Sequence, residues 1–327
     1  MLLKVFSGRN TFLQWLIIAI FWLGMLMLPV QIIPNQGFNP LYGFFVDLVG
    51  QNPWVIRFLF AVIFFGSALI AHIYAVQYGL FKRDRFHFLF FAPLFIFSSH
   101  WAWNISPPIV AFVFILLGTL RLFSIINLEN ANSEITASAV LFSIASLFYS
   151  VLVFDFFLII IALIIFRRFS FREVLLVMTS FLLPYIYLFS WYYLNDKFLD
   201  KWVDFTNQFH QFSLIVDWDY HWINIVFTTL MIIFNAIVIL LFLGKFRTKL
   251  IQIRNYSLFL VWGLIFSILA LFMAGHFMYY HFYMILFLLA FFMSLYFNDN
   301  KANWVFEGII LLIIIHKLYI ISQIIYA

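Results

Sequence analysis

The chain has 327 residues, of which 66% are hydrophobic and 9% are charged, and its formal net charge at pH 7 is +5. So few charged side chains exclude a soluble enzyme and indicate a chain whose solvent is lipid. The positive charge does not indicate nucleic-acid binding, because the basic residues form no contiguous basic domain. The absence of cysteine excludes disulfides and thiolate metal sites.

Apolar runs long enough for a membrane-spanning helix recur along the whole chain. Crossing about 30 Å of hydrocarbon takes roughly 20 helical residues. The first run, 12–30, is too long for a signal-peptide core and lacks a small-residue cleavage site, so we interpret it as a retained helix. The other clear candidates are 54–77, 173–194, 222–244, 256–275, 280–297 and 304–325.

Two further apolar regions, 86–123 and 135–166, are too long for one crossing and short for two. The first is interrupted from His100 to Pro108, where two consecutive prolines cannot continue a helix, and the second from Tyr149 to Asp155. We interpret each region as a pair of short helices. Their turns would lie near one membrane surface, where irregular backbone must be buried in protein or line a wet cavity. We therefore expect a cavity that opens outward.

Every second break between the apolar runs carries Lys and Arg, which favours a cytoplasmic position for those breaks. With both helix pairs counted, the sequence predicts an all-α transmembrane bundle of about eleven helices. Its N-terminus would be cytoplasmic and its C-terminus periplasmic, in one integral membrane domain over 1–327. Merging each pair into one long helix gives nine crossings and moves only 124–134 to the other side. The basic clusters are Lys4 and Arg9; Lys82, Arg83 and Arg85; Arg167, Arg168 and Arg172; and Lys245, Arg247, Lys249 and Arg254.

Polar side chains collect on the outward connections. Residues 41–49 are predicted to form a short interfacial helix that carries Asp47. A single interfacial His or Tyr is usually an anchor at headgroup level, but an ionisable residue inside a span is a functional candidate unless it merely pairs with another charge. The candidates for a shared cavity are Asp47, Arg57, His100, Asn104, Asp155, Asp217, Asp219, His221, His276, His281 and Lys317.

The loop from 195 to 221 contains one pattern that suits a metal ion. Asp217 and Asp219, followed by His221, have a spacing that can coordinate a divalent cation. The alternative is a solvated surface anchored by Trp218. The sequence contains no phosphate-cradling glycine loop and no His-Glu-x-x-His motif.

The order of these parts resembles the membrane half of glycosyltransferases of the C superfamily. The resemblance covers roughly residues 1–200 and rests on the outer loop with its acid, on the helix pairs that end in Arg-Arg-Phe-Ser-Phe-Arg-Glu (167–173), and on the long helix with Pro184. The helices of 222–327 follow that core. The first ten residues and the abundance of Phe also resemble a Phe-rich polytopic family of Bacteroidetes, which implies the bacterial inner membrane but no activity.

Such transferases take a sugar from a polyprenyl-phosphate carrier at the periplasmic face. The resemblance assigns Asp47 the role of general base or metal ligand, and the phosphate would be held by Arg57, Lys317, His276 or His281. The chain departs from the pattern because its first outer loop has one acid and no large soluble domain follows. Two other functions stay open. A transporter would show internal pseudo-symmetry, which the sequence does not display, and a scaffold subunit would need none of the charged candidates.

Overall fold

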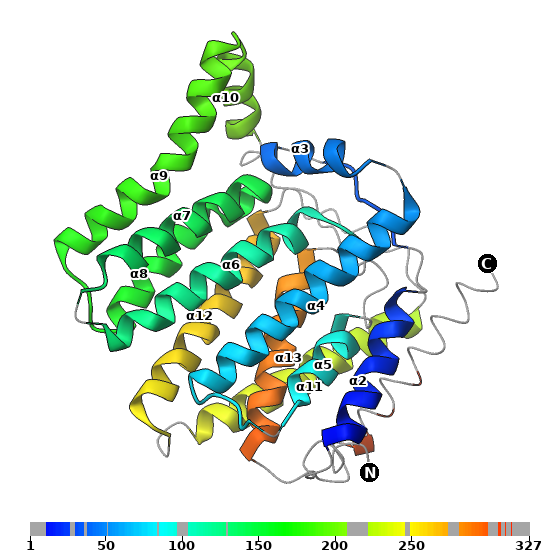
Figure 1. Ribbon diagram of the computed structural model, residues 1–327. Coiled ribbons are helices and arrows are strands. Elements are labelled where there is room, and N and C mark those ends of the chain that lie inside the picture. The colour runs from blue at the N-terminus through cyan, green and yellow to red at the C-terminus, as the bar shows by residue number, and fades with distance from the viewer. Residues whose placement is uncertain are drawn as a thin grey trace.

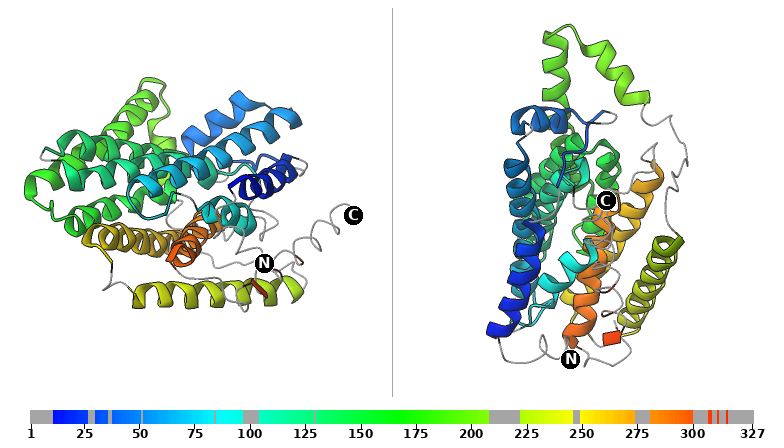
Figure 2. Two further views of the ribbon diagram at one scale, coloured as in Figure 1. Left: turned by 60° about the horizontal axis from the view of Figure 1, so that its bottom comes forward. Right: turned by 90° about the vertical axis from the view of Figure 1, so that its right-hand side faces the viewer.

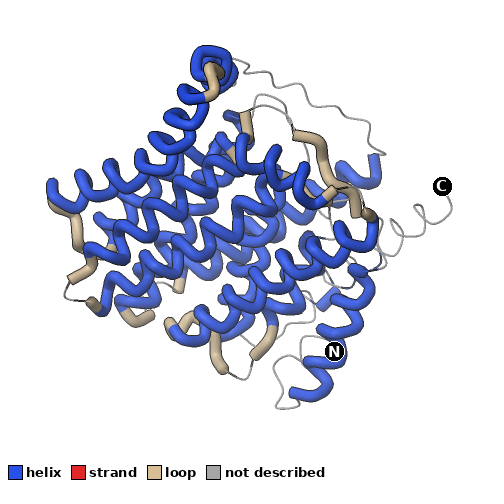
Figure 3. Tube along the Cα trace, turned by 45° about the horizontal axis from the view of Figure 1, so that its top comes forward, coloured by secondary structure: helices blue, strands red, loops and turns tan. Residues whose placement is uncertain are grey.

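The computed structural model describes residues 11–26, 30–35, 38–50, 52–83, 85–96, 104–128, 130–207, 222–245, 249–273 and 281–299, together with 307, 308, 311 and 315. These residues form twelve α-helices and no strand apart from one isolated β-bridge, which confirms the predicted all-α class (Figures 1 and 3). Buried side chains from α2 to α13 form one continuous core.

Most of the helices run back and forth between the two ends of one bundle (Figure 1). Two short helices differ, because α3 lies across one end and α10 packs beside the end of α9. In chain order the helices are α2 (Thr11–Leu26), α3 (Pro40–Val49), α4 (Pro53–Gln77), α5 (His87–Ile96), α6 (Pro107–Ser124), α7 (Asn132–Phe148), α8 (Asp155–Ile165), α9 (Phe171–Leu194), α10 (Phe198–Asn207), α11 (Trp222–Gly244), α12 (Ile251–Met273) and α13 (Phe282–Asp299).

Four of these helices, α4, α6, α9 and α12, are long and apolar enough to cross a membrane. They are compatible with a multi-pass membrane protein. Much of α9 and α12 faces outward with large apolar side chains, such as Ile186 and Leu269, which suits lipid as the surrounding solvent. Because the other apolar helices in the described residues are shorter or only partly described, the total of about eleven crossings stays a prediction, as does the glycosyltransferase-C-like arrangement.

Both long apolar regions are divided into two helices, as predicted. The first forms α5 and α6, and the second forms α7 and α8, with the 3-10 helix η2 (Ser150–Phe154) between them. The connection after α6 lies beside the turn that follows α8, since the Arg168 guanidinium donates a hydrogen bond to the Leu128 carbonyl. This places 125–131 at the same end as the basic turns, as the paired-helix interpretation requires.

We call the end that carries α3 and α10 the α3 end. The opposite end, which we call the basic end, is formed by the described residues of the connections after α4, α6, α8 and α11, namely 78–83, 85–86, 125–128, 130–131, 166–170, 245 and 249–250 (Figure 2). At the basic end the backbone amide of Lys82 donates to Asn298 Oδ1 (2.9 Å). The pKa of Lys249 is lowered by burial and by the neighbouring ammonium groups of Lys82 and Lys245. Two basic turns distant in sequence therefore meet at this end.

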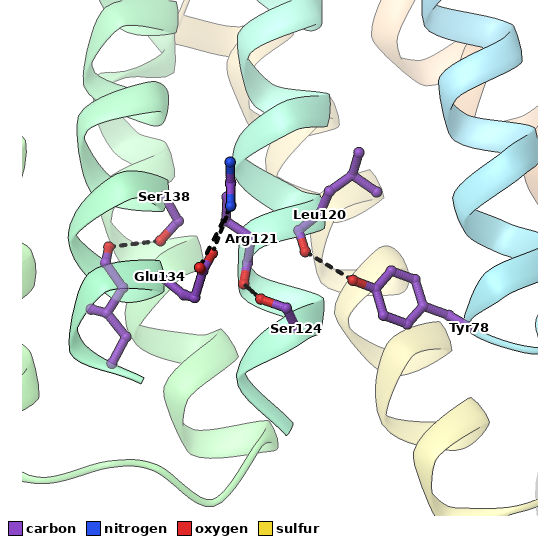
Figure 4. A network of polar contacts seen from close by, with 7 residues as sticks. Tyr78, Leu120, Arg121, Ser124, Glu134 and Ser138 are labelled. Atoms are coloured by element: carbon purple, nitrogen blue, oxygen red, sulfur yellow. Dashed lines mark hydrogen bonds and ion pairs between the residues drawn. The ribbon is translucent and has the colours of Figure 1, made fainter. Parts of the chain in front are cut away.

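Three neighbouring helices are tied together near the basic end (Figure 4). The hydroxyl of Tyr78, the C-cap residue of α4, donates to the Leu120 carbonyl on α6 (3.2 Å). Arg121, also on α6, forms an ion pair with Glu134 on α7 (3.3 Å). The helices α6 and α7 also approach closely at Gly118, where a Cβ atom would lie 2.6 Å from the Phe142 ring. The packing of α4, α6 and α7 thus combines a tyrosine hydrogen bond, an ion pair and a close approach of two helices at a glycine.

Candidate functional site

The capping loop, which we define as residues 31–35, 38 and 39, contacts the end of the connection between α5 and α6 at the α3 end. Ile32 forms a parallel bridge with Ile105, in which the Ile33 amide donates to the Ile105 carbonyl (2.9 Å) and the Ile105 amide donates to the Gln31 carbonyl (2.9 Å). The buried hydroxyl of Tyr42, on α3, lies within hydrogen-bonding distance of the Ile33 (2.7 Å) and Ile105 (2.9 Å) carbonyls. The amide and carbonyl of Ile105, in the non-helical backbone just before Pro107, are therefore satisfied by protein groups, as their burial demands.

The capping loop also holds the interruption between α7 and α8. Asn39 Oδ1 accepts hydrogen bonds from the Ser150 amide (3.0 Å) and from the Ser150 hydroxyl (3.2 Å). The Asn39 Nδ2 group donates to Asn35 Oδ1 (3.1 Å), and Asn35 Nδ2 donates to the Asn39 carbonyl (3.2 Å). One loop thus fixes both interrupted helix pairs.

Asp47 lies near the end of α3, on its exposed side between Phe44 and Leu48, which are exposed as well. The opposite side of α3 buries Tyr42 against the bundle. Within the described residues, Asp47 forms no hydrogen bond or ion pair. Its carboxylate is therefore accessible on a helix whose outer side is largely apolar, as an interfacial helix should be.

Arg57 lies one turn into α4, just beyond the turn that connects α3 to α4. Its guanidinium carbon lies 5.5 Å from the centroid of the Trp54 ring, and its buried Nε has no hydrogen-bond partner among the described residues. Trp54 itself is 75% exposed, and its amide donates to the capping side chain of Asn52 (3.0 Å). Asp47 and Arg57 thus flank one turn without forming an ion pair.

His281 and Asn104 are both engaged in contacts that stabilise the α3 end. The His281 Nδ1 atom lies 2.6 Å from the Tyr149 hydroxyl, and the two rings stack at 5.4 Å. Asn104 Oδ1 accepts from the Gln31 amide (3.1 Å). Both residues are buried. Their hydrogen bonds give them positioning roles that sequence alone did not indicate.

Asp155 is the first residue of α8 and lines a cavity of about 80 Å³ between α4, α6, α8, α12 and α13. The cavity extends to Tyr78 and Leu80, near the basic end, and none of Asp47, Arg57, Asn104 and His281 lines it. Contrary to the expectation of one shared cavity, this cavity does not bring Asp155 together with those four residues. The physical reason is that η2 carries the chain back into the bundle, so that Asp155 lies below the interruption and among apolar helices.

The remaining predicted site residues lie outside the described residues. They are His100, Asp217, Asp219, His221, His276 and Lys317. The proposed cation spacing in the 195–221 loop is therefore still a prediction, and elsewhere in the described chain no three His, Asp or Glu side chains converge as metal ligands would.

Sequence reasoning also missed the four residues that hold the α3 end together: Asn39, Tyr42, Tyr149 and Ser150. The available signal was weak, because only the turn-like stretch around Asn39 marked that loop. Comparison of the chain with protein-family models, curated proteins and solved structures finds no match.

Proposed function

We propose that the protein is a membrane-embedded glycosyltransferase of the C superfamily type, which transfers a sugar from a polyprenyl-phosphate carrier at the α3 end. In this proposal the α3 end faces the periplasm and the basic end faces the cytoplasm of a bacterial inner membrane. The observation that carries it is the pair of groups at the α3–α4 turn: an accessible Asp47 carboxylate, and an Arg57 guanidinium with an unsatisfied Nε.

Arg57 is suited to a lipid phosphate. A guanidinium binds phosphate through two parallel N–H donors, and a buried N–H without an acceptor is costly, so a phosphate oxygen at Nε would remove that cost. Trp54, whose ring lies 5.5 Å from the guanidinium carbon, and Phe44 and Leu48 on α3 are exposed, and they offer apolar surface for the first prenyl units of a carrier. A cation next to exposed apolar side chains matches the chemistry of a lipid-linked phosphate.

Asp47 supplies the base that transfer to a hydroxyl acceptor needs. The acceptor oxygen bonds to the anomeric carbon while the bond from that carbon to the carrier phosphate breaks. Asp47 takes the proton of the acceptor hydroxyl, and Arg57 balances the charge that develops on the departing phosphate. Every step uses groups that flank the same turn, and none depends on the cavity that contains Asp155.

The activity is tested in cells that express Asp47→Asn or Arg57→Gln in place of the natural chain. We expect lipid-linked sugar to accumulate and outer-face glycans to be lost, whereas Asp200→Asn, an exposed acid on α10, should leave both unchanged. Normal glycans with normally expressed Asp47→Asn would overturn the proposal and favour a scaffold.

Orientation has its own test, because the chain contains no natural cysteine. A membrane-impermeant thiol reagent added to intact spheroplasts should label Leu48→Cys on α3 but not Asn130→Cys near the basic end. Both positions are exposed in the structure. The opposite labelling pattern would invert the proposed orientation and remove the periplasmic assignment.

A further inference from the structure

The cavity in the middle of the bundle combines one carboxylate with an aromatic lining. Asp155 is 6% exposed, and its neighbours on the cavity wall include Phe112, Phe123, Phe259 and Phe287. These groups come from α6, α8, α12 and α13, so the site is assembled by tertiary packing rather than by one helix. Neither Asp47 nor Arg57 lines it, which separates this cavity from the transferase proposal.

Asp155 has no partner of opposite charge in the described part of the chain. No hydrogen bond or ion pair of its carboxylate exists there, and Arg121, the only base within α6, is already paired with Glu134. Lys82, Arg83, Arg167 and Arg168 lie in the turns of the basic end. A buried carboxylate without a partner carries a large cost, and side chains of this kind inside a membrane bundle usually mark a ligand or ion site.

Two hydroxyl groups on the cavity wall already use their protons within the protein. The Tyr78 hydroxyl donates its proton to the Leu120 carbonyl (3.2 Å), and the Ser267 hydroxyl donates to the Gly263 carbonyl (2.8 Å). A carboxylate supplies acceptors only, and aromatic faces attract cations. The lining therefore favours a ligand that brings both protons and positive charge.

The size of the cavity limits that ligand. About 80 Å³ exceeds the roughly 10–15 Å³ that one water needs, so a group of several heavy atoms fits. On one wall Gly263 adds room, because a Cβ atom there would meet only Leu288 Cδ1, at 4.0 Å. A single ring or a short branched alkyl group is the appropriate size.

We infer that this cavity is a binding site for a small amphiphilic cation, that is, an aromatic or branched alkyl group with one ammonium. The ammonium pairs with Asp155, and the apolar part packs on the phenylalanine side chains. Such an amine crosses lipid in its neutral form and takes up a proton when it pairs with the carboxylate. Nothing in this inference requires the transferase activity.

The test compares two probes of nearly equal size with the purified full-length protein in detergent. Benzylamine is an ammonium ion at pH 7, and benzyl alcohol is its neutral counterpart. We expect benzylamine to raise the melting temperature and to bind at least about tenfold more tightly than the alcohol by calorimetry. The isosteric Asp155→Asn variant should lose this preference.

A second variant tests the cavity with Asp155 intact. Gly263→Leu fills the space and should abolish benzylamine binding, whereas Gly66→Leu on α4, where nothing lies within 4 Å of an added Cβ, should leave it unchanged. If Asp155→Asn does not fold, the comparison of Gly263→Leu with Gly66→Leu still shows whether benzylamine binds in this cavity. Equal binding of both probes, no binding to the natural chain, or full binding to Gly263→Leu would each overturn the inference.

Discussion

The two interrupted helix pairs, α5/α6 and α7/α8, are broken by different means although one loop holds both. The first break precedes Pro107 and Pro108, and its backbone bridges to Ile32. The second contains no proline and is a 3-10 turn whose first residue, Ser150, is bound by Asn39. The first interruption is thus marked by prolines in the local sequence. The second depends on a contact between residues that are distant in the sequence.

The largest expected effect comes from Asn39→Leu, which removes the Oδ1 atom that accepts hydrogen bonds from the Ser150 amide and hydroxyl. Because two hydrogen bonds from buried donors would be lost, we expect the free energy of unfolding to fall by about 3 kcal/mol. Denaturation in detergent measures it. Asn52→Ala, an exposed N-cap at the same end, serves as control and should cost about 1 kcal/mol. Equal losses for the two variants would mean that the second break does not depend on the capping loop.

Gly118→Ala tests whether the two pairs pack directly on each other. A Cβ atom at this position of α6 would lie 2.6 and 2.7 Å from atoms of the Phe142 ring on α7, so we expect a loss of about 2 kcal/mol. Gly66→Ala has open space around its Cβ and should be neutral or stabilising by up to about 1 kcal/mol. Melting curves that place Gly118→Ala at or above the natural chain would contradict the close approach of α6 and α7.

Tyr42→Phe removes the hydroxyl shared by the Ile33 and Ile105 carbonyls, and so weakens the first break alone. We expect a loss of about 1.5 kcal/mol and faster hydrogen exchange of the Ile33 and Ile105 amides. The control is Tyr187→Phe, an exposed tyrosine on α9. Faster exchange at Ser150 rather than at Ile105 would show that the two breaks are not independent.

Replacing Pro107 and Pro108 together with alanine should have the smallest effect, within about 0.5–1 kcal/mol. The β-bridge and the Tyr42 hydroxyl still bind the backbone of Ile105 in this variant. We therefore expect α5 and α6 to stay separate helices without the two prolines. Hydrogen exchange at Ile105 reports this. If its protection changes to that of a helix continuing from α6, the first break depends on proline, and the β-bridge and Tyr42 are not sufficient to maintain it.

These differences explain how far the fold could be predicted. Region lengths and the two prolines predicted both helix pairs, and the basic clusters predicted which turns share an end. Nothing within Tyr149 to Phe154 is a strong helix breaker, so the second break followed from length alone. Its partner, Asn39, lies 111 residues away, and a contact across that distance is not visible in a single sequence.

The candidate site was less predictable than the fold. Asp155 was singled out as an ionisable residue within an apolar region, because the cost of charge there depends on local sequence, and its side chain is buried in the structure. Which residues share its cavity depends on how α4, α12 and α13 pack over α8, and sequence patterns do not encode that geometry. Asn104 and His281 were chosen as cavity residues for their polarity, yet both are engaged in hydrogen bonds within the α3 end.

The position of the capping loop has a consequence for biosynthesis. Tyr42 and Asn39 precede their partners Ile105 and Ser150 by 63 and 111 residues, so the loop leaves the ribosome before either hairpin is translated. Each hairpin can be captured as it enters the bilayer, which shortens the time its unpaired amides face hydrocarbon. A circular permutant that moves the capping loop to the end of the chain would reverse this order. Both hairpins would then enter the bilayer before the loop that binds them is synthesised.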